Sequence, residues 1–106
     1  IHNQQFKEVL DDLDINSSLD IIHTFIVDLS KKKVNNSISK TLNYLEEILK
    51  IIEKEIENIN IEIKEHQLKW FSRFRTSNCD AMIKNLIKHK KILDLRFDLL
   101  IKLINL

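Results

Sequence analysis

One stretch of the chain, residues 69–75, alternates cations with aromatic rings in the order Lys-Trp-Phe-Ser-Arg-Phe-Arg. Basic side chains neutralise phosphates, and exposed aromatic rings stack on single-stranded bases. The candidate contacts to an anionic partner are Arg73, Arg75, Lys88, Lys90 and Lys91. A structural role explains the same residues, because Trp70 continues a hydrophobic repeat and a basic helix would lie against an acidic one. The sequence favours that structural role, since an isoelectric point of about 8.0 lies below the range typical of nucleic-acid-binding domains.

The other reactive side chains do not form a catalytic or metal-binding set. Cys79 lies near a predicted helix start, where a thiolate is favoured, but the sequence assigns it no general base. His66 falls at a core position of the repeat, and the histidines are scattered without the spacing of metal ligands. The paired carboxylates at 11–12 and 46–47 are expected on the surface. We therefore expect no enzymatic activity, no metal and no cofactor.

The composition points to helices. The chain has 106 residues, 43% of them hydrophobic, and contains no glycine and no proline. Glycine-rich phosphate loops and glycine-dependent hairpins are thereby excluded. An excess of Ile, Lys and Asn is typical of an A+T-rich genome, so part of the missing glycine reflects mutational bias. Charge is uneven along the chain: −2 over residues 1–34, −3 over 35–68 and +6 over 69–106.

The strongest pattern is a heptad repeat that predicts one helix from about residue 38 to 75. Apolar residues alternate in steps of four and three, as in a coiled coil. The seam is formed by Leu42, Leu45, Leu49, Ile52, Ile56, Ile59 and Ile63. Ile48, Ile51 and Ile61 lie off this seam, so a second apolar face indicates contact with more than one other helix.

Three further helices are expected around this one. Residues 3–14 show helical spacing, and Ser17 with Asp20 forms a capping-box pattern for a second helix. Segment 30–37 is polar and is expected to be a loop. A return helix is predicted over about 78–106, with a counterpart seam of Leu93, Phe97, Leu100 and Ile104. Beyond residue 91 its apolar surface is too broad for one neighbouring helix to cover.

The sequence thus predicts an all-α, elongated antiparallel helical bundle or coiled-coil hairpin. We expect a single domain over residues 1–106, part of a longer chain, with two short helices in 1–34 and a hairpin in 35–106. The expected function is a non-catalytic scaffold or complex subunit that associates with itself or with partner proteins through helix packing, as a homo- or hetero-oligomer. A nucleic-acid-binding module and an adaptor that docks on a membrane or host protein are the alternatives. No segment is long enough to span a bilayer, and the single cysteine favours a reducing, intracellular compartment.

Overall fold

The structure is a computed structural model that describes residues 3–68 and 79–106, and this part of the chain is helical throughout apart from short connections and the last two residues. Its four helices are α1 (Asn3–Asp12), α2 (Ile15–Ser30), α3 (Asn36–Leu68) and α4 (Cys79–Ile104). The described residues contain no strand. The predicted all-α class is confirmed.

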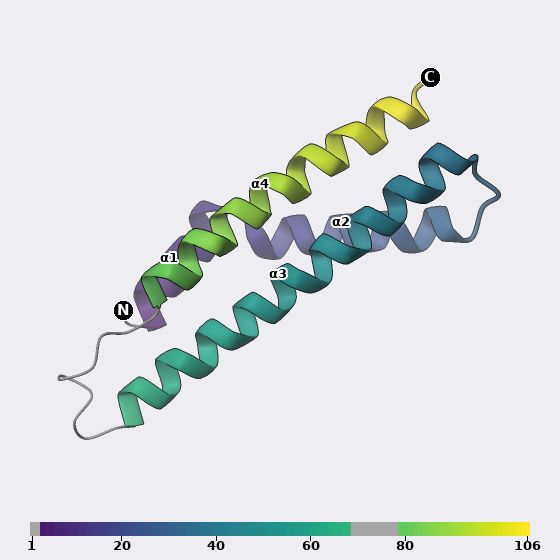
Figure 1. The fold of residues 1–106 in the computed structure, drawn as a ribbon. Coiled ribbons are helices and arrows are strands. Elements are labelled where there is room, and N and C mark those ends of the chain that lie inside the picture. The colour runs from purple at the N-terminus through teal and green to yellow at the C-terminus, as the bar shows by residue number, and fades with distance from the viewer. Residues whose placement is uncertain (1–2, 69–78) are drawn as a thin grey trace.

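Helices α3 and α4 form an antiparallel hairpin that determines the shape of the molecule (Figure 1). Helix α2 crosses behind this hairpin and packs on α3, while α1 packs on α2 behind the first half of α4. The principal extents are 56 × 20 × 18 Å. The predicted elongated antiparallel bundle is therefore confirmed, and α1 and α2 cover only one side of the hairpin.

The hydrophobic core runs along the line where the four helices meet. Its fully buried side chains include Phe6 from α1, Ile15 from α2, Ile52 from α3 and Leu93 from α4. Where α2 lies against α4, the rings of Phe25 and Phe97 meet edge to face, with centroids 5.5 Å apart. The core thus joins α2 to both helices of the hairpin.

The connection between α1 and α2 differs from the one predicted. Ser17 and Asp20 lie inside α2, so the predicted capping box is wrong. The chain changes direction instead at Asp14, which takes the left-handed conformation with φ 50° and ψ 38° and makes no side-chain cap. Aspartate tolerates this conformation better than most residues. The earlier start places Ile15 in the first turn of α2, where it is completely buried.

The connection between α2 and α3 spans residues 31–35, within the predicted loop. Asn35 caps α3: its side-chain oxygen accepts a hydrogen bond of 2.9 Å from the backbone N–H of Ile38. This bond satisfies one of the donors that a helix start leaves without an intrahelical partner. Helix α3 begins near its predicted start, whereas the predicted extension over residues 69–75 lies outside the described residues.

Candidate partner-binding surface

The predicted heptad seam of α3 faces the interior of the chain itself. Its buried members are Leu42, Leu45, Leu49, Ile52, Ile59 and Ile63. Ile56 is partly buried against the same cluster. On α4, Leu93 and Leu100 are buried, Phe97 is partly buried, and Ile104 is 37% exposed. Apart from Ile104, these residues belong to one hydrophobic cluster within the chain, so their side chains are covered without a second chain.

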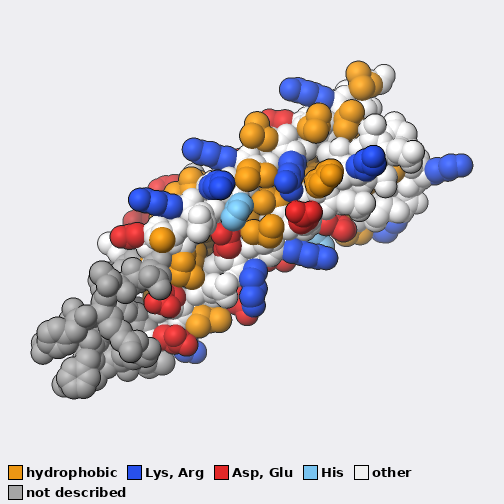
Figure 2. Space-filling model, in the orientation of Figure 1, with side chains coloured by type: hydrophobic (Ala, Val, Ile, Leu, Met, Phe, Trp, Pro, Cys, Tyr) orange, Lys and Arg blue, Asp and Glu red, His pale blue; other side chains and the backbone are white. Residues whose placement is uncertain are grey.

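A second apolar surface lies on the side of the hairpin that α2 does not cover. We call it the hairpin face and define it by four exposed residues: Tyr44 and Ile51 of α3, and Leu95 and Leu99 of α4. Their exposed fractions are 54%, 38%, 69% and 51%, respectively. A space-filling view of this side shows hydrophobic side chains interspersed with charged ones along both helices (Figure 2).

Two polar contacts join α3 to α4 beside the hairpin face. Arg96 Nη1 donates to the backbone oxygen of Tyr44 at 2.8 Å, and its guanidinium carbon lies 5.5 Å from the centre of the Tyr44 ring. Nearer the other end of the hairpin, His89 Nδ1 lies 2.7 Å from Glu55 Oε1. These contacts fix which residues of the two helices lie side by side.

The hairpin face lies opposite the side that contacts α2. On α4, Leu99 and Ile92 are three and four residues from Arg96, so they share its side of the helix. Phe97, which contacts Phe25 of α2, projects to the opposite side. Helices α1 and α2 both lie behind the hairpin (Figure 1). Within the described part of the chain, the four residues of the hairpin face are therefore left exposed.

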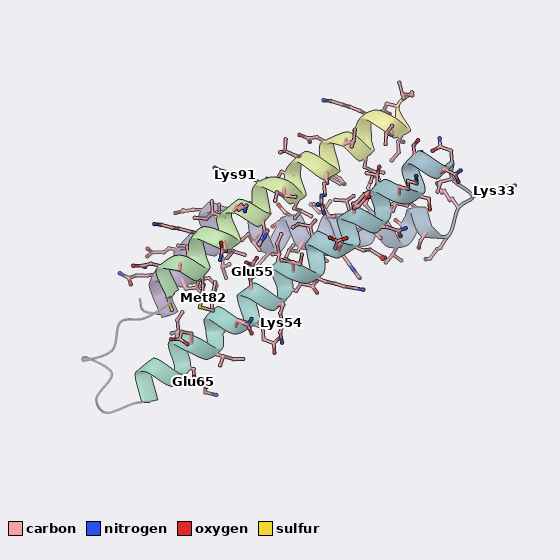
Figure 3. The ribbon with its side chains drawn as sticks, viewed as in Figure 1. Lys33, Lys54, Glu55, Glu65, Met82 and Lys91 are labelled. Carbon is pink, nitrogen blue, oxygen red and sulfur yellow. The ribbon has the colours of Figure 1, made fainter. Side chains whose placement is uncertain are left out.

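Of the predicted contacts to an anionic partner, the structure describes three, all of them on α4. Lys88 and Lys91 are exposed on α4, and Figure 3 shows Lys91 on the side of α4 away from α3, with Glu55 between the helices. Lys90 is only 7% exposed, and its ammonium donates to both carboxylate oxygens of Asp94 at 2.9 and 2.8 Å. Its charge is therefore already neutralised. Arg73, Arg75 and Trp70 lie outside the described residues.

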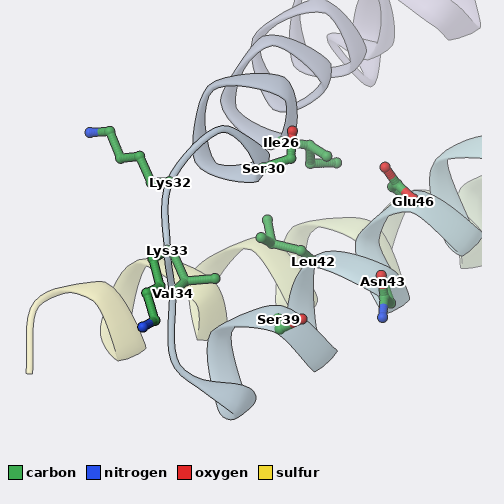
Figure 4. A pocket seen from close by; sticks show the side chains of 9 residues that line it. All are labelled: Ile26, Ser30, Lys32, Lys33, Val34, Ser39, Leu42, Asn43 and Glu46. Carbon is green, nitrogen blue, oxygen red and sulfur yellow. The ribbon is translucent and has the colours of Figure 1, made fainter.

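A hollow of about 350 Å³ lies where α2 turns into α3 (Figure 4). Apolar side chains of Ile26, Val34 and Leu42 contribute to its lining, together with Lys32 and Lys33. The two lysine side chains point away from each other, so their charges do not converge on one ligand. The hollow is a surface depression at a helix connection, and it offers no set of groups arranged for chemistry.

The remaining candidate reactive groups are also dispersed. Cys79 is buried in the first turn of α4, and the side chain of His66 lies outside the described part of the chain. Among the described residues, no group of three His, Cys, Asp or Glu side chains is placed to hold a metal ion. Within the same residues, no helix combines the length and apolar character needed to cross a bilayer.

Sequence reasoning missed the roles of three residues. Asn35 lies at the connection between α2 and α3, and His89 and Arg96 lie on α4 beside the hairpin face. Asn35 carried a detectable signal, because asparagine is a preferred N-cap and the helical repeat starts at Ile38. Glu55 and His89 flank the seam of their own helices, but their pairing depends on the register between α3 and α4. That register does not follow from the spacing of residues within either helix.

Comparison with known proteins reveals one similarity of sequence. The chain is 33% identical over 87 residues to uncharacterized protein L717 of Acanthamoeba polyphaga mimivirus, and the match covers 79% of this chain and 42% of that protein. The chain thus spans about two fifths of the length of the curated relative it matches. No known protein family matches the sequence. No solved structure matches it either.

Proposed function

We propose that the chain is a non-catalytic interaction subunit that binds another polypeptide by helix packing on the hairpin face. The observation that carries this proposal is the exposure of two leucines, an isoleucine and a tyrosine on one side of the hairpin. Single exposed apolar residues are ordinary on protein surfaces, but a group of them rimmed by charged residues is typical of an interaction site. The hairpin supplies a rigid base for it.

The chemistry of the face fits a protein partner. Complete burial of a leucine or isoleucine contributes about 1.5–3 kcal/mol, so covering Leu95, Leu99 and the exposed part of Ile51 offers a substantial gain. Tyr44 and Arg96 belong to the residue types enriched in the most important contacts of interfaces. Arg96 is already held against the Tyr44 ring and backbone, so binding costs it little conformational entropy.

Nucleic-acid binding is the second candidate, and it is supported by the exposed lysines of α4, among them Lys88 and Lys91. The same helix carries Leu95 and Leu99 at exposed positions, which a phosphate backbone would leave in water. Lys90 has its charge neutralised by Asp94. We therefore rank a polypeptide partner above nucleic acid.

The proposal is tested by capturing partners from cells of the source organism with tagged versions of the chain. The test variant is L95E/L99E, which adds two charges to the hairpin face. The matched control is I21E/V27E, which adds the same charges at two exposed positions of α2. We expect the wild type and the control to retain the same partner proteins, and L95E/L99E to lose them.

Circular dichroism of all three proteins checks that the substitutions leave the helices intact. Equal capture of the same partners by L95E/L99E and by the wild type contradicts the proposal, because the face would then contribute nothing. A shift of labelled oligonucleotides by the wild type at low salt, abolished by K88E/K91E but not by L95E/L99E, favours the second candidate instead.

A further inference from the structure

We infer that the partner on the hairpin face is a second copy of this chain, related by a two-fold axis that runs along the hairpin. The inference rests on the proposed function, because it names the occupant of the same face. In this arrangement α3 of each copy lies against α4 of the other, and four long helices form a closed bundle. Every neighbouring pair of these helices is antiparallel.

The first argument is the charge of the two helices. Helix α3 carries seven Glu and four Lys, a formal charge of −3, and α4 carries three Asp against five Lys and one Arg, a formal charge of +3. Complementary charges beside an apolar contact determine which helices associate and in what orientation. An acidic helix and a basic helix on one chain therefore suit a bundle in which each α3 has an α4 on both sides.

The second argument is that the single hairpin uses little of this complementarity. Among the described residues, neither ion pair between a lysine and a carboxylate joins α3 to α4: Lys54–Glu57 lies within α3 and Lys90–Asp94 within α4. The side chains of His89 and Glu55 are in contact between the two helices. The exposed lysines of α4 that take part in none of these pairs are Lys84, Lys88, Lys91 and Lys102. The acidic α3 of a second copy would lie beside these exposed lysines of α4 and pair with them.

The third argument concerns the apolar residues, which match under the same symmetry. Tyr44 lies beside Arg96 in the hairpin, and Glu55 lies beside His89. Tyr44 of α3 therefore lies at the height of the α4 segment that carries Leu95 and Leu99, and Ile51 lies about one helical turn from that segment. A two-fold axis along the hairpin preserves heights, so Tyr44 of each copy meets the leucines of the other, and Ile51 extends the same contact by about one helical turn.

The alternative symmetry places α4 against α4 across an axis perpendicular to the hairpin. That contact would also bury the leucines, but it brings together two helices that each carry a formal charge of +3. Like charges placed opposite each other oppose association. The charge pattern therefore selects the axis along the hairpin.

Reversing the charge of one helix at a time tests this arrangement. The α3 variant is E47K/E62K and the α4 variant is K84E/K91E. Glu47 and Lys91, and likewise Glu62 and Lys84, lie within about one helical turn of the same height, judged from the two contacts between α3 and α4. Sedimentation at low ionic strength measures the dimer dissociation constant of each variant. D11K/D12K on α1 is the matched control for the α3 variant, because it makes the same change of charge away from the hairpin face.

We expect the wild type and D11K/D12K to dimerise, and each reversed variant alone to dimerise at least about tenfold more weakly. An equimolar mixture of E47K/E62K with K84E/K91E should form a heterodimer, because one copy then has two basic helices and the other two acidic ones. Added salt should weaken that heterodimer. Far-UV circular dichroism at the same concentrations verifies that each variant is helical.

If E47K/E62K alone dimerises with the same dissociation constant as the wild type, the arrangement is overturned, because α3 would then take no part in the contact. If the wild-type chain stays monomeric over the whole concentration range, the inference that the partner is a second copy is contradicted. The proposed function would still be tested by the capture experiment. It would hold if the wild type captures a different protein that L95E/L99E fails to capture. Failure of the further inference is thus distinguishable from failure of the proposed function.

Discussion

The ammonium group of Lys90 is held close to the core by a single acidic neighbour one helical turn away. The Lys90 side chain is 9% exposed and that of Asp94 is 53% exposed. Removing one partner of a buried pair is costly because it leaves a charge without compensation, whereas replacing the charged residue by an apolar one of similar volume is often neutral or stabilising. The pair therefore need not contribute net stability.

We predict opposite effects for the two partners. Asp94→Ala should lower the free energy of unfolding by about 1 kcal/mol, less than for a fully buried pair because Asp94 is largely in water. Lys90→Met should leave it unchanged or raise it. Urea unfolding followed by circular dichroism measures both values. A larger loss for Lys90→Met than for Asp94→Ala would show that the ion pair itself stabilises the fold.

Side-chain spacing in the sequence predicted most of the buried residues of α3 and α4, because a seven-residue repeat places them on one side of a helix. It placed Ile48 outside the seam, although Ile48 is buried, and Ile104 within it, although Ile104 is 37% exposed. Lys90 was expected as a candidate contact to an anionic partner, whereas the structure has it buried. Side-chain spacing did not predict that Asp94 holds Lys90, or that Arg96 reaches Tyr44. Such contacts depend on rotamers and on the register between helices, and neither follows from spacing alone.

The start of α3 depends on one side chain. The backbone N–H of Ile38 donates a hydrogen bond to Asn35 Oδ1, which caps this helix. We predict that Asn35→Ala lowers the free energy of unfolding by about 1 kcal/mol, and that Asn35→Asp, which keeps an acceptor, costs much less. Thermal unfolding of the three proteins measures the difference. Equal losses for Ala and Asp would indicate that the Asn35 backbone conformation, rather than its acceptor, matters.

Neighbouring isoleucines of α3 have different roles. Ile52 is completely buried between the helices, and Ile51 is 38% exposed on the hairpin face. We predict that Ile52→Ala lowers the free energy of unfolding by about 2–5 kcal/mol, because it leaves a cavity. Ile51→Ala should cost about 0.5 kcal/mol or less in the monomer.

Chemical unfolding at several protein concentrations separates the two roles. Binding to the folded state makes apparent stability depend on concentration. The cost of Ile52→Ala should be the same at every concentration, whereas that of Ile51→Ala should grow as the wild type dimerises. Similar costs at the lowest concentration would contradict the assignment of Ile52 to the interior and Ile51 to the face.

For the whole molecule, the breadth of the apolar surface on α4 was visible in the sequence, but its meaning was not. Residues beyond 91 are apolar around most of the helix, which predicts several neighbouring helices. The structure supplies α3 and α2, and Leu95 and Leu99 remain exposed. The spacing of apolar residues along a helix indicates how much of its surface is apolar. It does not indicate whether the same chain or another one covers that surface.

The shape of the dimer follows from its symmetry and distinguishes the two possible axes. The hairpin face lies in the first half of α3 and the second half of α4, away from the middle of a molecule that is 56 Å long. A two-fold axis along the hairpin places the two copies side by side at the same height, so the dimer should be wider than the monomer but nearly as long. An axis perpendicular to the hairpin, passing through the off-centre face, would displace the copies along each other and lengthen the particle. Small-angle X-ray scattering at concentrations where the dimer predominates should therefore give a maximum dimension close to that of the monomer and a larger cross-section. A clearly longer particle would indicate the perpendicular axis, in which α4 packs against α4 despite its charge.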